Sequence, residues 1–118
     1  MKKGIALLAA VFVFMFSTVI AFAEGASASI YYGKRSDTSN PVYLNAGHNL
    51  RIQVSNDGSS ESAVYYEVYS GWNNVRDRGT IAPGRGINKI KGLPEGEYRI
   101  YIKCKYGDHC RAKAIISD

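Results

Sequence analysis

Hydrophobic and polar residues alternate most regularly over two segments near the middle of the chain. Residues 48–55 read H-N-L-R-I-Q-V-S and residues 63–69 read A-V-Y-Y-E-V-Y, so every second side chain in each segment is apolar. A period of two is typical of a β-strand with one buried face. Asp57-Gly58, within the polar loop 56–60, is a favoured hairpin turn. The pattern therefore predicts a central β-hairpin made of these two strands.

A third alternating segment lies near the C-terminus, at residues 97–104, and a shorter strand-like run follows it at residues 111–116. A turn sequence at Gly107-Asp108 separates the two runs. The only two cysteines of the chain, Cys104 and Cys110, stand on either side of this turn. The sequence predicts a second hairpin clamped by a disulfide. Its inward residues would be Tyr98, Ile100, Ile102 and Cys104.

The remaining apolar runs are shorter. We expect a frayed start at residues 24–29 and turns throughout residues 34–41. Short strands are expected at residues 30–32, 42–44, 75–81 and 87–91. Gly79 is expected to form a bulge, and the last strand is expected either to carry a bulge or to lie at an edge. No segment after residue 23 shows a helical period over ten or more residues. The prediction is all-β: one small antiparallel β-sandwich of about seven or eight short strands, spanning residues 24–118.

Residues 1–23 have the features of a secretory signal peptide. Lys2 and Lys3 precede a long apolar run, and the segment ends in the small-x-small sequence Ala21-Phe22-Ala23. This arrangement predicts a signal helix that is cleaved after Ala23, and hence secretion from the cell. An uncleaved membrane anchor is the alternative.

An oxidising compartment favours pairing of Cys104 with Cys110. Their five-residue separation matches neither a redox C-x-x-C motif nor a zinc knuckle. We therefore expect a structural disulfide and neither a metal nor a cofactor.

Enzymatic activity is not expected. The histidines, His48 and His109, both fall in predicted turns, and no serine lies in a G-x-S-x-G sequence. Glu95 and Glu97 could share a face, but nothing around them indicates a substrate cleft.

All four Phe residues lie within the first 23 positions, so nine Tyr and Trp72 are the aromatic residues of the predicted domain. Tyr66 and Tyr98 are expected in the core. Outward tyrosines with a loop tryptophan are typical of surfaces that bind sugars or proteins, although the same rings could equally serve the core. The residues concerned are Tyr65, Tyr69 and Trp72, with Tyr31, Tyr32 and Tyr43.

Positive charge is concentrated in the second half of the chain. Residues 71–118 carry ten Lys and Arg against five Asp and Glu, whereas residues 24–70 are net acidic. If the C-terminal hairpin forms, every second side chain of its strands points outward, and most of these outward side chains are basic. The members of this expected anion-binding face are Arg99, Tyr101, Lys103, Lys105, Arg111 and Lys113. The alternative is that these charges only keep an edge hairpin soluble.

These features predict a secreted, non-enzymatic binding protein whose basic hairpin face contacts an anionic extracellular partner. A cell-wall polymer or a membrane surface fits this charge; an extracellular protein is a further option, and nucleic acid is not expected. A bacteriocin-like secreted toxin and an inhibitor of an extracellular enzyme are the alternatives. The inhibitor would present the clamped loop at residues 105–109.

Overall fold

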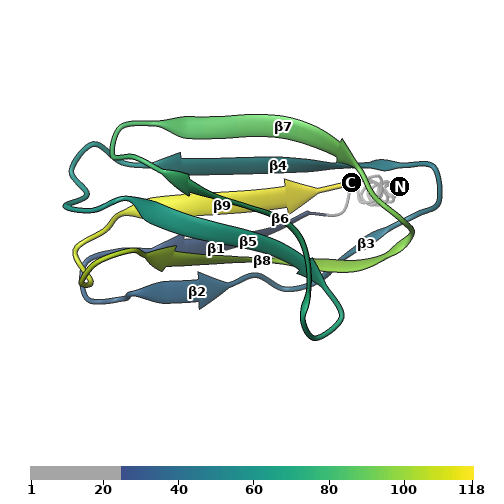
Figure 1. The fold of residues 1–118 in the computed structure, drawn as a ribbon, viewed down its shortest axis with the longest axis horizontal. Coiled ribbons are helices and arrows are strands. Elements are labelled where there is room, and N and C mark those ends of the chain that lie inside the picture. The colour runs from purple at the N-terminus through teal and green to yellow at the C-terminus, as the bar shows by residue number, and fades with distance from the viewer. Residues whose placement is uncertain (1–24) are drawn as a thin grey trace, which may run out of the picture.

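The computed structural model describes residues 25–118, which form nine β-strands in two antiparallel sheets packed face to face (Figure 1). The all-β prediction is confirmed. The strands in chain order are β1 (Gly25–Ile30), β2 (Ser36–Thr38), β3 (Val42–Leu44), β4 (Asn49–Asn56), β5 (Val64–Ser70), β6 (Asn74–Ile81), β7 (Gly86–Gly92), β8 (Gly96–Cys104) and β9 (Ala112–Ser117). No helix within these residues could cross a membrane. The predicted signal peptide and the cleavage after Ala23 lie outside the described residues.

Sheet I has the strand order β1-β9-β4-β7, and sheet II has the order β2-β8-β5-β6. β3 also belongs to sheet II, because it pairs with the first residues of β8 while β2 pairs with the last. Alternate residues of both sheets point into a common core, as expected for a sandwich. Tyr66 and Tyr98 are both fully buried there, which confirms that tyrosine takes the place of phenylalanine in this core.

The predicted central hairpin is wrong. β4 pairs with β7 and β9 in sheet I, whereas β5 pairs with β6 and β8 in sheet II. Residues 57–63 therefore form an arch that carries the chain from one sheet to the other. Asn56 fastens this arch, because its side-chain amide donates to the carbonyl oxygens of Ser62 (3.1 Å) and Ile81 (2.9 Å). Gly58 does not adopt the positive φ that a tight Asp-Gly hairpin turn would need.

The C-terminal disulfide is confirmed, but the hairpin around it is not. Cys104 and Cys110 are bonded, with Cα atoms 5.7 Å apart, and both are fully buried. β8 lies in sheet II between β5 and the β2/β3 pair, whereas β9 lies in sheet I between β1 and β4. The disulfide therefore closes a second arch between the sheets. Both hairpin predictions failed for one reason: strands that share a core across two sheets alternate in the same way as strands that pair side by side.

Two strands lie mostly where no strand was predicted; of their residues, only Ile30 belongs to a predicted strand, the one at residues 30–32. β1 occupies the expected frayed start, and all six of its residues pair with β9. β2 occupies part of the expected turn segment and pairs with β8. Neither segment is apolar enough to be recognised alone, because each is an edge strand that buries few side chains.

The predictions for β6 and β7 are partly confirmed. β7 is an edge strand, as expected, and Ile90 is 57% exposed on its outer side. Ile81 is buried, but Val75 is exposed rather than inward. The β6 bulge lies not at Gly79 but opposite Val68 and Tyr69, where Arg76 is the extra residue.

An aspartate closes each open side of the sandwich. On one side, Asp37 of β2 accepts the backbone N–H of Ser29 in β1 (2.8 Å). On the other, Asp77 of β6 pairs with Lys89 (2.8 Å) and Lys91 (3.4 Å) of β7. Both contacts join sheet I to sheet II where no backbone ladder connects them.

Candidate anion-binding site at the arch end

The structure separates the six residues of the predicted anion-binding face. Arg99, Tyr101 and Lys103 are alternate residues of β8 on the outer face of sheet II, and Lys105 follows in the disulfide loop. Lys113 lies on the outer face of sheet I, and Arg111 precedes β9 at its end. The single basic face is therefore wrong, because β8 and β9 belong to opposite sheets.

Three basic side chains do converge at the end of the sandwich where the two arches lie. Arg85, Arg111 and Lys113 line a hollow of about 660 Å³ on the outer side of sheet I. Sheet register places Ser29 and Ser55 on either side of Lys113, on β1 and β4. The hollow thus combines three cations with the hydroxyl groups of two serines, a combination that suits an anion with several oxygen atoms. We call this the arch-end pocket.

Glycine shapes the floor of the arch-end pocket. Gly86 faces Ser55 in the β4–β7 ladder. A Cβ atom at Gly86 would lie 3.0 Å from the carbonyl oxygen of Val54. Gly86 therefore permits a close approach of β7 to β4 beneath the pocket.

The position of Arg111 is fixed by backbone contacts with the first arch. Its N–H donates to Ser60 Oγ (2.7 Å), and its carbonyl oxygen accepts the N–H of Asp57 (2.8 Å). Glu61 N–H donates to the carbonyl oxygen of His109 (2.9 Å), which joins the arch to the disulfide loop. Two loops that are distant in sequence therefore hold one another at this end of the molecule.

The pocket has one acidic neighbour. The pKa of Asp57 is held below its ordinary value, first by hydrogen bonds from the Ser59 hydroxyl and backbone N–H, and then by the positive charge of Arg111. The Arg111 guanidinium also lies over the ring of Tyr32, 5.7 Å from its centroid. Arg85 and Lys113 form no ion pair with any described residue. Within residues 25–118, nothing therefore occupies these two cations in place of a ligand.

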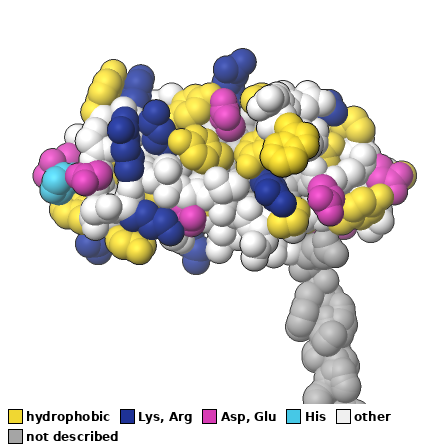
Figure 2. Space-filling view, turned by 90° about the horizontal axis from the view of Figure 1, so that it is seen from below, with side chains coloured by type: hydrophobic (Ala, Val, Ile, Leu, Met, Phe, Trp, Pro, Cys, Tyr) yellow, Lys and Arg dark blue, Asp and Glu magenta, His cyan; other side chains and the backbone are white. Residues whose placement is uncertain are grey.

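Further basic residues lie at the same end of the sandwich as the pocket. The space-filling view shows Lys and Arg side chains gathered toward the left, the end at which the β8–β9 arch lies in Figure 1 (Figure 2). Arg35 and Lys105, both exposed, flank the ends of β2 and β8 there. Positive charges from several loops therefore add at this end. The predicted hairpin face included Lys105, Arg111 and Lys113 but neither Arg35 nor Arg85.

The two histidines lie at opposite ends of the sandwich and make separate local contacts. His48, just before β4, lies 2.9 Å from Asp118 after β9. His109 lies 3.0 Å from Asp108 and meets the Tyr32 ring edge-on. Within residues 25–118 no group of three or more His, Cys, Asp or Glu residues is placed to hold a metal ion.

The outward aromatic residues of sheet II are only partly covered. Tyr65 and Tyr69 are half-buried on β5, and Trp72 is 93% exposed in the β5–β6 turn. Tyr106 is 71% exposed in the disulfide loop. Trp72 therefore does not cap the core, and its role in a binding surface stays a prediction.

Comparison with known proteins yields a similarity of fold. No family model matches the sequence, and no curated protein resembles it. Among solved structures, the chain is similar to the pre-peptidase C-terminal domain of a collagenase from Bacillus anthracis, with a TM-score of 0.59 and 16% sequence identity. The similarity covers 80% of this chain and 89% of that domain. Two chains so different in sequence share an arrangement of strands, and function has to be argued from the site.

Proposed function

We propose that this protein is a secreted, non-enzymatic binding protein whose arch end contacts an anionic extracellular polymer. The observation that carries the proposal is the convergence of Arg85, Arg111 and Lys113 on one hollow. The predicted signal peptide would deliver the protein to the cell exterior, where wall polymers and membrane surfaces present phosphate or carboxylate groups.

The arrangement favours a polymer over a flat lipid surface. The basic side chains line a hollow flanked by the Ser29 and Ser55 hydroxyls, so an anionic group could enter it and accept several hydrogen bonds. A membrane surface would instead be met by outward charges on a flat face. The arches that frame the hollow are held by the disulfide and by the Arg111–Ser60 contacts, which lowers the entropic cost of binding.

Retention measurements test the proposal. The purified protein is passed over a purified anionic cell-wall polymer and over anionic vesicles, at low salt and at about 1 M NaCl. We expect retention on the polymer at low salt and release at high salt, with weaker retention on vesicles. No retention on either material at low salt would contradict the proposal, and retention on vesicles alone would replace the polymer with a membrane as the partner.

One observation favours a second candidate, inhibition of an extracellular enzyme. The disulfide closes the loop at residues 105–109, and Tyr106 is 71% exposed within it. A rigid loop that presents an aromatic side chain suits insertion into a cleft. Under this candidate, Y106A would abolish inhibition of a target enzyme and leave retention on the anionic polymer unchanged.

A further inference from the structure

The outer face of sheet II carries a second hollow, which shares no lining residue with the arch-end pocket. It has a volume of about 450 Å³ and is lined by Glu67, Tyr69, Gly71, Trp72, Asn73, Val75, Arg99 and Tyr101. A smaller hollow of about 220 Å³ adjoins it and adds Glu97. The two hollows share Tyr69, Gly71, Trp72 and Arg99, and we refer to them together as the aromatic groove.

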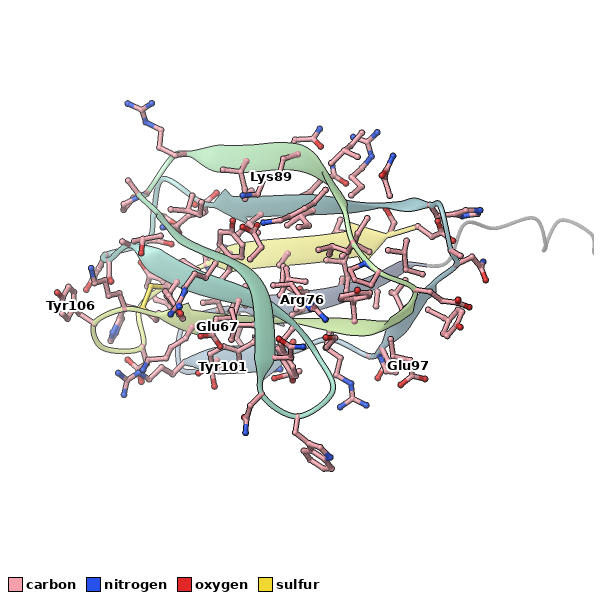
Figure 3. The ribbon with its side chains drawn as sticks, turned by 45° about the vertical axis from the view of Figure 1, so that its right-hand side comes forward. Glu67, Arg76, Lys89, Glu97, Tyr101 and Tyr106 are labelled. Atoms are coloured by element: carbon pink, nitrogen blue, oxygen red, sulfur yellow. A yellow bond between two sulfur atoms is a disulfide. The ribbon has the colours of Figure 1, made fainter. Side chains whose placement is uncertain are left out.

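Sheet register explains why these side chains meet. Tyr69 of β5 lies opposite Arg99 of β8, and Glu67 lies opposite Tyr101. Directly opposed side chains in antiparallel strands are about 5 Å apart at Cβ, so the four form one continuous block. Glu67 and Tyr101 appear close together on the same side of the sandwich (Figure 3).

The β5–β6 hairpin supplies the wall of the groove. Gly71 adopts a positive φ of 63°, which lets the three-residue turn place Trp72 at its tip. The bulge at Arg76 adds local twist to the hairpin. The turn extends beyond the body of the sandwich in Figure 1, and Trp72 lines the groove together with Tyr101 of β8.

We infer that the aromatic groove binds a neutral polysaccharide chain. A pyranose ring has an apolar C–H face that stacks on an aromatic ring, and its hydroxyl groups both donate and accept hydrogen bonds. Trp72, Tyr69 and Tyr101 provide the rings. Arg99 and Asn73 provide donors, while the Glu67 and Asn73 side chains provide acceptors. The volume of the main hollow lies in the range of about 300–1,000 Å³ that is usual for small-ligand sites.

The charges of the groove favour an uncharged ligand. In the main hollow Arg99 is the one basic residue and Glu67 the one acidic residue, so the lining has no net charge. The smaller hollow adds Glu97, so the groove as a whole sets Arg99 against two glutamates and would not attract an anionic polymer. This contrasts with the arch-end pocket, where three basic residues face one acidic residue.

The arrangement also favours a chain over a single sugar. The two hollows lie on either side of the shared Trp72 and Arg99, so successive units of a polymer could occupy one hollow each. A protein-binding hot spot would instead be expected to bury its aromatic anchor within an apolar surround. Here charged or amide side chains, Glu67, Arg99 and Asn73, stand among the rings.

Trp72 makes the inference directly testable, because it is the only tryptophan of the chain. Its fluorescence is titrated with neutral hexasaccharides of β-1,4-glucose, β-1,3-glucose, β-1,4-xylose and β-1,4-N-acetylglucosamine. We expect a saturable change with at least one of them, with a Kd between about 1 μM and 1 mM that is unchanged in about 1 M NaCl. No change with any member of the panel would overturn the inference.

Matched variants assign the binding to the groove. Y101A should weaken the fluorescence titration about tenfold, whereas Y106A, an exposed aromatic residue outside the groove, should leave it unchanged. W72A removes a side chain that is 93% exposed, so the fold should be retained while retention on the matching insoluble polysaccharide is lost. An equal loss in Y106A would overturn the assignment. Retention on immobilised denatured casein that depends on Trp72, without retention on any polysaccharide, would also overturn it and identify a protein-binding groove.

This inference stands independently of the anionic-polymer proposal. The groove lies on sheet II and its binding should resist salt, whereas the arch-end pocket lies on sheet I and its binding should be abolished by salt. Either site can therefore fail its test without affecting the other.

Discussion

Lys89 and Asp77 form an ion pair across the side of the sandwich, with 2.8 Å between Nζ and Oδ2. The two residues belong to different sheets, and both strands are edges. Asp77 is only 9% exposed and also accepts a hydrogen bond from the hydroxyl of the core residue Tyr66 (2.9 Å). Figure 3 shows Lys89 on β7 at this side of the molecule. Inward-pointing lysines on an edge strand also discourage pairing with another chain, so the contact closes the sandwich and protects its edge.

Folding lowers the pKa of Asp77. Burial opposes ionisation of the carboxyl, but hydrogen bonds from Lys89 and Tyr66 and the charges of Lys89 and Lys91 outweigh it. A carboxyl whose pKa is lowered by folding stabilises the fold above its unfolded-state pKa, and this stabilisation is lost as the pH falls through the folded-state value. The contribution of Asp77 should therefore be complete above about pH 5 and lost in stronger acid.

D77N tests this linkage. At pH 7 the variant should lose about 1–2 kcal/mol of unfolding free energy, because two half-exposed lysines lose their buried partner. The difference from the unsubstituted protein should shrink as the pH falls below about 4, where Asp77 itself becomes protonated. Urea denaturation of both proteins at several pH values measures this difference in unfolding free energy. E97Q, at an exposed carboxylate, should change stability by less than about 0.5 kcal/mol. A D77N difference that stays constant down to pH 2 would contradict the linkage.

Gly79 should be intolerant of a side chain. A Cβ atom there would lie 2.8 Å from Cε1 of Tyr66. The Tyr66 ring lies beside Gly79, and its hydroxyl donates to Asp77 on the same strand. G79A should therefore cost about 1–3 kcal/mol through displacement of a buried ring. G58A is the matched control, because a Cβ at Gly58 meets nothing within 4 Å. Equal thermal stability of the two variants would show that the Tyr66 ring adapts freely.

The disulfide should stabilise the arch without defining the strand pairing. Replacing Cys104 and Cys110 with alanine should lower the unfolding free energy by about 2 kcal/mol, as expected for a short closed loop. The sheets should persist, because β8 and β9 are each held by other strands. Amide exchange should quicken at residues 105–111 and in the adjoining arch at residues 57–63. Collapse of both sheets on loss of the disulfide would contradict this account.

The arch-end pocket should be distinguishable from the other basic surfaces by paired charge changes. R111Q/K113Q removes two positive charges from the pocket, and R51Q/R76Q removes two from exposed or half-exposed positions elsewhere. The first variant should weaken binding to an anionic wall polymer about thirtyfold at low salt, since two nearby charges at about 1 kcal/mol each amount to about 2 kcal/mol. The second should weaken binding by less than about twofold.

Salt titration of both variants supplies the remaining control. The dependence of binding on salt should be shallower for R111Q/K113Q than for R51Q/R76Q, because fewer counterions are exchanged at the site. Equal weakening in both variants would show that net charge alone, and not the pocket, governs retention.

Local pattern in the sequence determined the strands that carry the core. The alternation at residues 48–55, 63–69 and 97–104 correctly placed Leu50, Tyr66 and Tyr98 inside, since a half-buried strand must separate its two faces. Cysteine count and the expected oxidising compartment were enough to predict the disulfide, because two cysteines allow one pairing.

Only the tertiary structure decided which strands are neighbours. Inward and outward residues alternate along a strand in the same way in either sheet. The sequence therefore did not distinguish a hairpin, which joins neighbours in one sheet, from an arch, which joins the two sheets. The arch places Lys113 on the outer face of sheet I, opposite Lys103 on sheet II. Arg85, from another loop, lies beside the same pocket as Lys113. The packing of the two sheets also pairs Lys89 with Asp77. Pairing of β5 with β8 lets Trp72 and Tyr101 line the same groove. Both candidate sites are therefore built from contacts between distant segments, and such contacts exist only after the two sheets have packed.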